Sequence, residues 1–543
     1  MSELIKEYKM YKKSYKVLWW VTIGLFILEL INLSYVNLTQ LQNHMGYDAS
    51  SYYLKAVEMW KQHTPFIKNW VEQTTLYYDS TVPLAAVFMK IFGDIFVAYG
   101  VSNLIMVALI AIVFNRIMKK MQISLLIRSV MICVILCPFI GLDYYISNDL
   151  GYFSCILSAS GCYAYKILIS LMFIYSFMIL TEKEKIQPIQ MGYLAVTCLG
   201  ILISGISSGY HVGITVIVPT LLYGIMSAFR HNSLKQLSRR NMIFVYINLA
   251  ITLLGKYLAV HVIHYTSREN GISLIGLYDF WGNLGSIFLG YLELLSGMAY
   301  ESNVLAVSVE GIIYLSGLAL AITILALFVL YVKCQKNAQM KNESETGGVI
   351  ISVVIFQIIM YAIISSKYGS FIFEIRYLIL PFYGMLICAG KCLDSLDENL
   401  LEKWFVIAGI IICTLIMSVK SYEHYNQTKI DTDLMNNIKE TVSEIDSPVV
   451  YVIGDATLGR NMRVYDIDKV YKYADVIEGA VLPRHWGDYI YYDHRTEWPG
   501  KVILVSTAGA YELLPQEIQQ QTKTVAQYQN ITIYTLEENM LGK

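Results

Sequence analysis

The chain has 543 residues, of which 56% are hydrophobic and 15% are charged, and its mean hydropathy is +0.49. This composition is too apolar for an average soluble protein, so most of the chain is expected to lie in lipid. The formal net charge of −1 gives no overall preference for nucleic acid, and we expect no nucleic-acid partner.

A lysine-rich N-terminus precedes the first apolar run, from Val17 to Val36. This run is longer than the core of a signal peptide, and no small-residue cleavage site follows it, so we predict a retained first span. A helix needs roughly 20 apolar residues to cross the hydrocarbon layer. The sequence offers about eleven such runs, at 17–36, 95–115, 124–141, 162–181, 190–206, 211–229, 242–263, 308–332, 348–366, 376–390 and 404–420.

Lys and Arg residues are distributed unevenly between the loops. They are frequent at 116–120, 230–240 and 333–341, whereas the loops at 142–161 and 205–210 contain none. Because short cytoplasmic loops are enriched in Lys and Arg, the N-terminus is predicted to be cytoplasmic. An odd number of spans then places the C-terminus outside, in a multi-pass protein of the cell membrane.

The first outer loop, at about 37–94, contains two apolar-rich segments, 49–62 and 81–93, that are too short or too charged to cross. Both are predicted to be helices lying in the membrane interface. Asp48 either caps the first helix or acts as a general base on an acceptor. Asp79 either caps the second helix or contacts an acceptor or sugar, and Tyr52 is a further candidate for sugar contact.

The next outer loop, GLDYYISNDLGYF, carries Asp143 and Asp149. These carboxylates could join Asp48 in catalysis, in binding sugar hydroxyls, or around a divalent cation, since hard cations take oxygen ligands. The alternative is ordinary turn chemistry, because Ser, Asn and Asp are typical turn residues.

Cationic residues run toward and past the outer end of the seventh expected span, in the order Lys256, His261, His264 and Arg268. They could hold a phosphate, or they could extend along the apolar surface toward water. Lys256 could instead pair with Glu29 of the first span, since an ionisable residue within a span requires a partner or a function.

Glu374 and Arg376 lie where the chain re-enters the membrane, in FIFEIRYLILPFYG. Arg376 suits phosphate binding and Glu374 sugar binding, whereas the alternative is an interfacial anchor formed by the pair.

The segment from about residue 421 to 543 changes character. An amphipathic stretch at 430–445 precedes PVVYVIGD, KVILVSTAG, LPQEIQQQTKTVAQ and NITIYTL, which predict helix, strand, strand, helix and strand. We therefore expect a small extracytoplasmic α/β domain. Its VIGDATLGRN loop lacks the Lys-Ser/Thr that a nucleotide phosphate loop requires.

Residues 1–420 resemble the GT-C superfamily of membrane glycosyltransferases, which includes protein O-mannosyltransferases and aminoarabinose lipid A transferases. The resemblance rests on Asp48 in GYDASSYY, on Asp143 and Asp149 in the following outer loop, and on RYLILPFY at 376–383. It implies a polyprenyl-phosphate-linked sugar donor, inversion at the anomeric carbon, and a first-loop carboxylate as base. The acceptor would be a glycan, a lipid or a protein of the cell envelope, and the C-terminal domain is a candidate for binding it.

Two alternative functions remain open. A transporter or flippase of lipid-linked saccharides would place its polar residues at the bilayer midplane and would show related halves. A polysaccharide polymerase with an arginine-rich outer site would carry more arginine in the outer loops than this sequence does.

Overall fold

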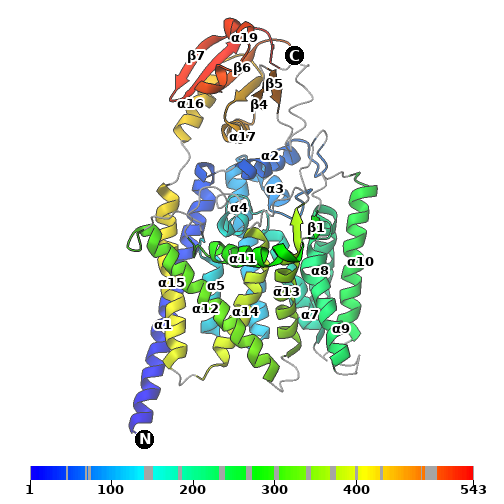
Figure 1. Ribbon diagram of the computed structural model, residues 1–543, viewed down its shortest axis with the longest axis vertical. Coiled ribbons are helices and arrows are strands. Elements are labelled where there is room, and N and C mark those ends of the chain that lie inside the picture. The colour runs from blue at the N-terminus through cyan, green and yellow to red at the C-terminus, as the bar shows by residue number, and fades with distance from the viewer. Residues whose placement is uncertain are drawn as a thin grey trace. The chain divides into compact units, whose positions relative to one another are not determined.

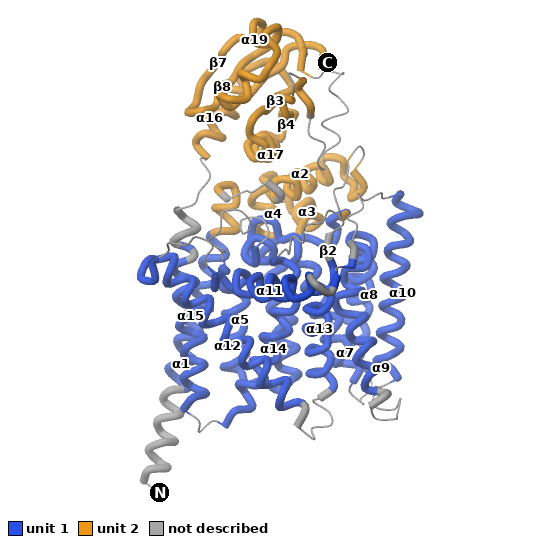
Figure 2. The backbone as a smooth tube through the Cα atoms, viewed as in Figure 1, with its two compact units in different colours: residues 1–35, 76–80, 103–427 blue, residues 36–75, 81–102, 428–543 orange. Residues whose placement is uncertain are grey.

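The computed structural model describes residues 2–44, 47–67, 70, 75–139, 151–181, 186–230, 239–264, 272–274, 276–298, 305–337, 344–366, 375–397, 401–427, 432–477, 480–483 and 498–541. The chain forms two compact units, which are coloured separately in Figure 2. The first unit comprises residues 1–35, 76–80 and 103–427, and the second comprises 36–75, 81–102 and 428–543.

The first unit is almost entirely helical. Figure 1 shows its long helices running alongside one another, with α11 lying across them. Its elements are α1 (Ser2–Tyr35), α4 (Ile95–Lys120, with its first residues in the second unit), α5 (Leu125–Leu136), η3 (Phe153–Leu157), α7 (Ala164–Thr181), α8 (Pro188–Ser208), η4 (Gly213–Ile217), α9 (Val218–Arg230), α10 (Arg239–His261), β1 (Ile272–Leu274), α11 (Leu277–Leu294), α12 (Val309–Asn337), α13 (Ser344–Ile363), β2 (Ile364–Ser366), η5 (Ile375–Leu378), α14 (Ile379–Ser395) and α15 (Leu401–Gln427).

The expected membrane spans all coincide with helices. Within the described residues, nine helices are long and apolar enough to cross a membrane. The other two expected spans, 124–141 and 211–229, correspond to shorter apolar helices at Leu125–Leu136 and Gly213–Ser227. The prediction of a polytopic helical membrane protein is confirmed, since such helices satisfy their own backbone hydrogen bonds within lipid.

Helices α8 and α10 approach each other closely at a glycine. At Gly255 of α10, an added Cβ would lie 2.8 Å from backbone atoms of Gly205 and Leu202 in α8, so glycine permits this close approach.

Glu29 of α1 is buried and accepts a hydrogen bond from the Ser418 hydroxyl of α15. The predicted Glu29–Lys256 pair is therefore wrong: a neighbouring span supplies the partner of Glu29.

The second unit contains the segment that the sequence predicts to be the first outer loop, with η1 (Val36–Gln40), η2 (Leu41–His44), α2 (Tyr47–Lys61) and α3 (Val82–Phe92). The two helices predicted in this loop are present. Because α2 begins at Tyr47, Asp48 lies inside the helix and not before it. The residue before α3 is Thr81, so Asp79 is not its N-cap residue. α3 ends at Phe92, and its C-cap residue Gly93 has a φ of 70°, which favours glycine.

The same unit contains the C-terminal sheet domain. Its elements are α16 (Thr432–Ser443), β3 (Val449–Ile453), α17 (Ala456–Tyr465), β4 (Val470–Ile477), β5 (Ala480–Pro483), β6 (Val502–Thr507), α18 (Ala508–Tyr511), α19 (Gln516–Gln521), β7 (Lys523–Tyr528) and β8 (Ile531–Leu536). The strand order is β5-β4-β3-β6-β8-β7, with β3 parallel to both β4 and β6 and the other pairs antiparallel.

The small α/β domain is thus confirmed, with one correction. The predicted helix over LPQEIQQQTKTVAQ is helical only in its first half, as α19, and its second half is strand β7. β7 is an edge strand with mostly exposed, polar side chains, so it lacks the apolar alternation that signals a strand.

Candidate functional site

A small pocket lies between helices of the first unit. Its wall is formed by residues just before and within α7, just before and within η4, on α13, in η5 and at the start of α14. They are Tyr163, Lys166, Ile167, Ser170, His211, Thr215, Gln357, Tyr361, Arg376, Tyr377 and Leu380. The cavity volume is about 10 Å³, which is about enough for one water molecule. Within the described part of the chain, this wall holds two cations, one histidine and no carboxylate.

The two cations of the pocket share one aromatic ring. Lys166 Nζ lies 4.8 Å from the centre of the Tyr163 ring, and Arg376 Cζ lies 5.8 Å from the same centre. Arg376 Cζ is also 5.9 Å from the centre of the Tyr377 ring, which stacks on Tyr361 at 5.6 Å. Aromatic faces attract cations, so these rings help to hold both side chains at the pocket.

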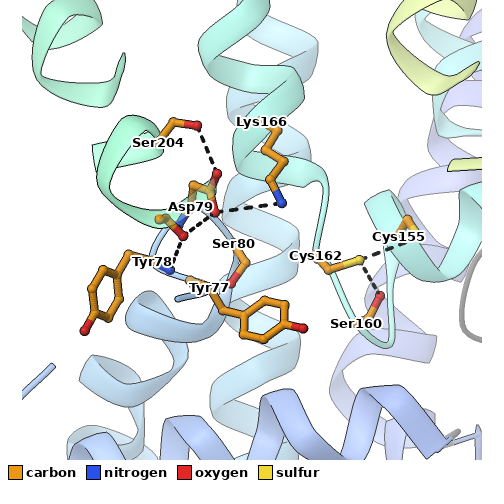
Figure 3. Close-up of polar contacts among 10 residues, drawn as sticks. Tyr77, Tyr78, Asp79, Ser80, Cys155, Ser160, Cys162, Lys166 and Ser204 are labelled. Atoms are coloured by element: carbon orange, nitrogen blue, oxygen red, sulfur yellow. Dashed lines mark hydrogen bonds and ion pairs between the residues drawn. The ribbon is translucent and has the colours of Figure 1, made fainter. Parts of the chain in front are cut away.

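A tight turn before α7 places Tyr163 and Lys166. The amide N–H groups of Ser160 and Gly161 donate to the Ser154 carbonyl, and the Tyr163 N–H donates to the Cys155 carbonyl at 3.1 Å. Gly161 has a φ of 52°, which the turn requires. Figure 3 shows the side chains packed here, with Cys162 Sγ lying 3.7 Å from Cys155 Sγ.

Asp79 brings a carboxylate next to Lys166 of this cationic wall (Figure 3). Its Oδ1 lies 3.8 Å from Lys166 Nζ, and its side chain is 0% exposed. Two hydroxyls at the end of α8 donate to it, Ser207 at 2.6 Å and Ser204 at 2.9 Å. Ser207 also accepts from the Tyr78 and Asp79 amides, so the segment is fixed to α8. A buried and saturated carboxylate is a counter-ion for Lys166 and not an exposed ligand for sugar.

The structure brings only part of the predicted site together. Arg376 lines the pocket, as the phosphate-binding prediction requires. Lys256 is half-buried on α10 and His264 is exposed, and neither lines this pocket. Tyr52 is buried in the second unit. Asp143, Asp149, Arg268 and Glu374 lie outside the described residues, as does the side chain of Asp48.

Lys166 and His211 were not among the residues predicted from the sequence. Lys166 is an ionisable residue near the start of an expected span, and that signal alone marks a functional candidate. The metal prediction stays a prediction, because its three carboxylates are not described. Within the described residues, no group of three His, Cys, Asp or Glu side chains could hold a metal ion.

Comparisons with known proteins identify the fold. No family model and no curated protein matches the sequence. Two solved structures of ArnT from Cupriavidus metallidurans do resemble this chain. The apo state has a TM-score of 0.57, and the state bound to undecaprenyl phosphate has a TM-score of 0.55. Each is 11% identical, and each match covers 94% of this chain and 97% of ArnT. The GT-C fold expected from the sequence is therefore confirmed.

Proposed function

We propose that this chain is a membrane glycosyltransferase that takes its sugar from a polyprenyl-phosphate carrier, and that Lys166 and Arg376 bind the carrier's phosphate. The observation that carries this proposal is the pair of cations held at one pocket wall by the Tyr163 ring. Asp79 partly offsets the charge of Lys166, and an anion that enters the pocket would be attracted by both Lys166 and Arg376. The GT-C fold and the undecaprenyl phosphate bound in one ArnT structure favour a lipid phosphate as this anion.

The proposed reaction transfers the sugar with inversion. An acceptor hydroxyl or amine attacks the anomeric carbon, and the bond from that carbon to the phosphate oxygen breaks. The leaving phosphate gains negative charge, which Lys166 and Arg376 stabilise in the transition state. Asp48, on α2, takes the acceptor's proton as general base, a role that rests on the sequence resemblance. The acceptor itself is a cell-envelope glycan, lipid or protein.

The pocket must widen to take a phosphate, since its volume is about that of one water molecule. Lys166 and Arg376 both have long side chains whose ends can turn toward an entering anion. The flippase alternative predicts binding of the same lipid without transfer, so a transfer assay separates these two functions.

The first experiment measures binding of undecaprenyl phosphate to the purified protein in nanodiscs. A hydrogen bond to a charged group contributes about 1.5–3 kcal/mol, so Lys166→Met and Arg376→Met should each weaken binding by roughly 10- to 100-fold. Lys119→Met is the control, because the exposed Lys119 near the end of α4 does not line the pocket, and it should leave binding unchanged. Unchanged binding in both pocket variants would refute the site.

A second arm separates lipid from free anion and tests the chemistry. Inorganic phosphate at the same concentration should not compete, since the prenyl chain contributes apolar burial that free phosphate lacks. Sugar transfer from a total lipid extract should be abolished by Asp48→Asn while expression stays normal. Full transfer by Asp48→Asn would remove Asp48 from the mechanism and leave the binding site untouched.

A further inference from the structure

The C-terminal sheet domain packs on the first outer loop within the second compact unit. Helix α17 of the sheet domain contacts α2, the loop helix that begins one residue before Asp48. These segments are separated by about 400 residues in the chain, yet hydrogen bonds, buried charge and aromatic contacts join them. A domain serving only as a tethered binding module would not require such contacts.

Hydrogen bonds join the sheet domain to the loop. Arg460 Nη1 donates to Ser51 Oγ of α2 at 2.8 Å. Lys61 Nζ, at the last residue of α2, donates to the Ile467 carbonyl at 2.6 Å. The Tyr465 hydroxyl donates to the Gln42 carbonyl in η2. Both ends of α2 and the turn before it are therefore fixed by the sheet domain.

Of two buried arginines on α17, Arg460 donates a hydrogen bond to α2. Arg460 and Arg463 are both buried, three residues apart on α17. Arg463 Nε donates to the Tyr471 carbonyl of β4, inside the sheet domain, whereas Arg460 reaches α2. A buried guanidinium is costly unless its donors are paired, and the Ser51 hydroxyl of α2 is one of the acceptors that stabilise Arg460.

An aromatic cluster continues this contact. Tyr465 of α17 packs edge-on against Phe96 in the first turn of α4, at 5.5 Å between ring centres. Phe96 contacts Tyr53 of α2, which stacks on Tyr99 at 4.1 Å. Since Tyr53 and Tyr99 are fully buried, this cluster restricts the rotation and sliding of α2.

We infer that the C-terminal domain positions α2, and that Arg460 is a positioning residue for this helix and for Asp48 on it. The catalytic part of this inference rests on the proposed function, whereas the positioning itself does not.

The test measures hydrogen–deuterium exchange of the full-length protein in nanodiscs. Arg460→Met should speed exchange of the α2 amides at least threefold, while amides of β3 and β6 keep their protection. Lys469→Met is the control: Lys469 donates to the Ile445 and Ser447 carbonyls within the sheet domain. It should leave α2 exchange unchanged. Unchanged α2 exchange in Arg460→Met would overturn the inference.

If Arg460→Met unfolds the sheet domain, Tyr465→Phe provides the decisive measurement, because it removes only the hydroxyl bound to Gln42. Exchange at residues 41–44 and in α2 should then rise, and unchanged exchange refutes positioning. In the transfer assay, Arg460→Met should lower kcat without changing KM for the lipid donor, and Arg460→Lys should restore part of kcat. If Arg460→Met speeds α2 exchange but the wild-type protein transfers no sugar, the proposed function is refuted and the positioning of α2 stands.

Discussion

The buried ion pair between Asp79 and Lys166 supports a quantitative prediction about stability. Their charged atoms lie 3.8 Å apart, and the two side chains are 0% and 8% exposed. At an effective dielectric constant of 20, two unit charges at this distance attract by about 4 kcal/mol. Asp79→Asn removes the negative charge and leaves Lys166 buried beside a neutral amide. We expect it to lower the free energy of unfolding by about 3–5 kcal/mol.

The assay is unfolding of the purified protein in detergent micelles by increasing SDS, followed by tryptophan fluorescence. A double-mutant cycle isolates the pair: Asp79→Asn combined with Lys166→Met should be less destabilising than the sum of the single changes by about 1–3 kcal/mol. Asp94→Asn is the matched control, because the exposed Asp94 caps α4 through the Phe96 and Val97 amides. Asn caps a helix as well as Asp does, so the change should stay within about 0.5 kcal/mol. An Asp79→Asn protein as stable as the wild type would refute the role of Asp79 as counter-ion.

Two glycines support further predictions, measured by the same unfolding assay. Gly255→Ala should lower the free energy of unfolding by about 1–3 kcal/mol, because its Cβ would press on the α8 backbone, whereas Gly192→Ala of α8 has open space and should be neutral. Gly454→Ala should destabilise the sheet domain by about 3 kcal/mol, measured as faster amide exchange in β3, because φ is +86° and the Cβ would overlap the Thr507 hydroxyl. Gly509→Ala, with open space around it, should leave β3 exchange unchanged.

The sequence by itself determined the class of protein and most of its elements. Every expected span is a helix, and both loop helices are present near their predicted bounds. The reason is that membrane crossing depends on composition along one short segment, which is a local property of the chain. Arg376 was also predicted from a local property of the chain. A charge placed where the chain re-enters lipid is costly unless it has a function.

Only the tertiary structure decided which polar residues meet. Lys166, His211 and Arg376 line one pocket although they are separated by up to 210 residues, and no periodicity in the sequence encodes that distance. Asp79 was expected as a cap or sugar ligand, but the end of α8 and Lys166 bury its carboxylate. The contact of α17 with α2 was likewise not predictable, because buried ion pairs and hydrogen bonds are properties of chain segments brought together by folding.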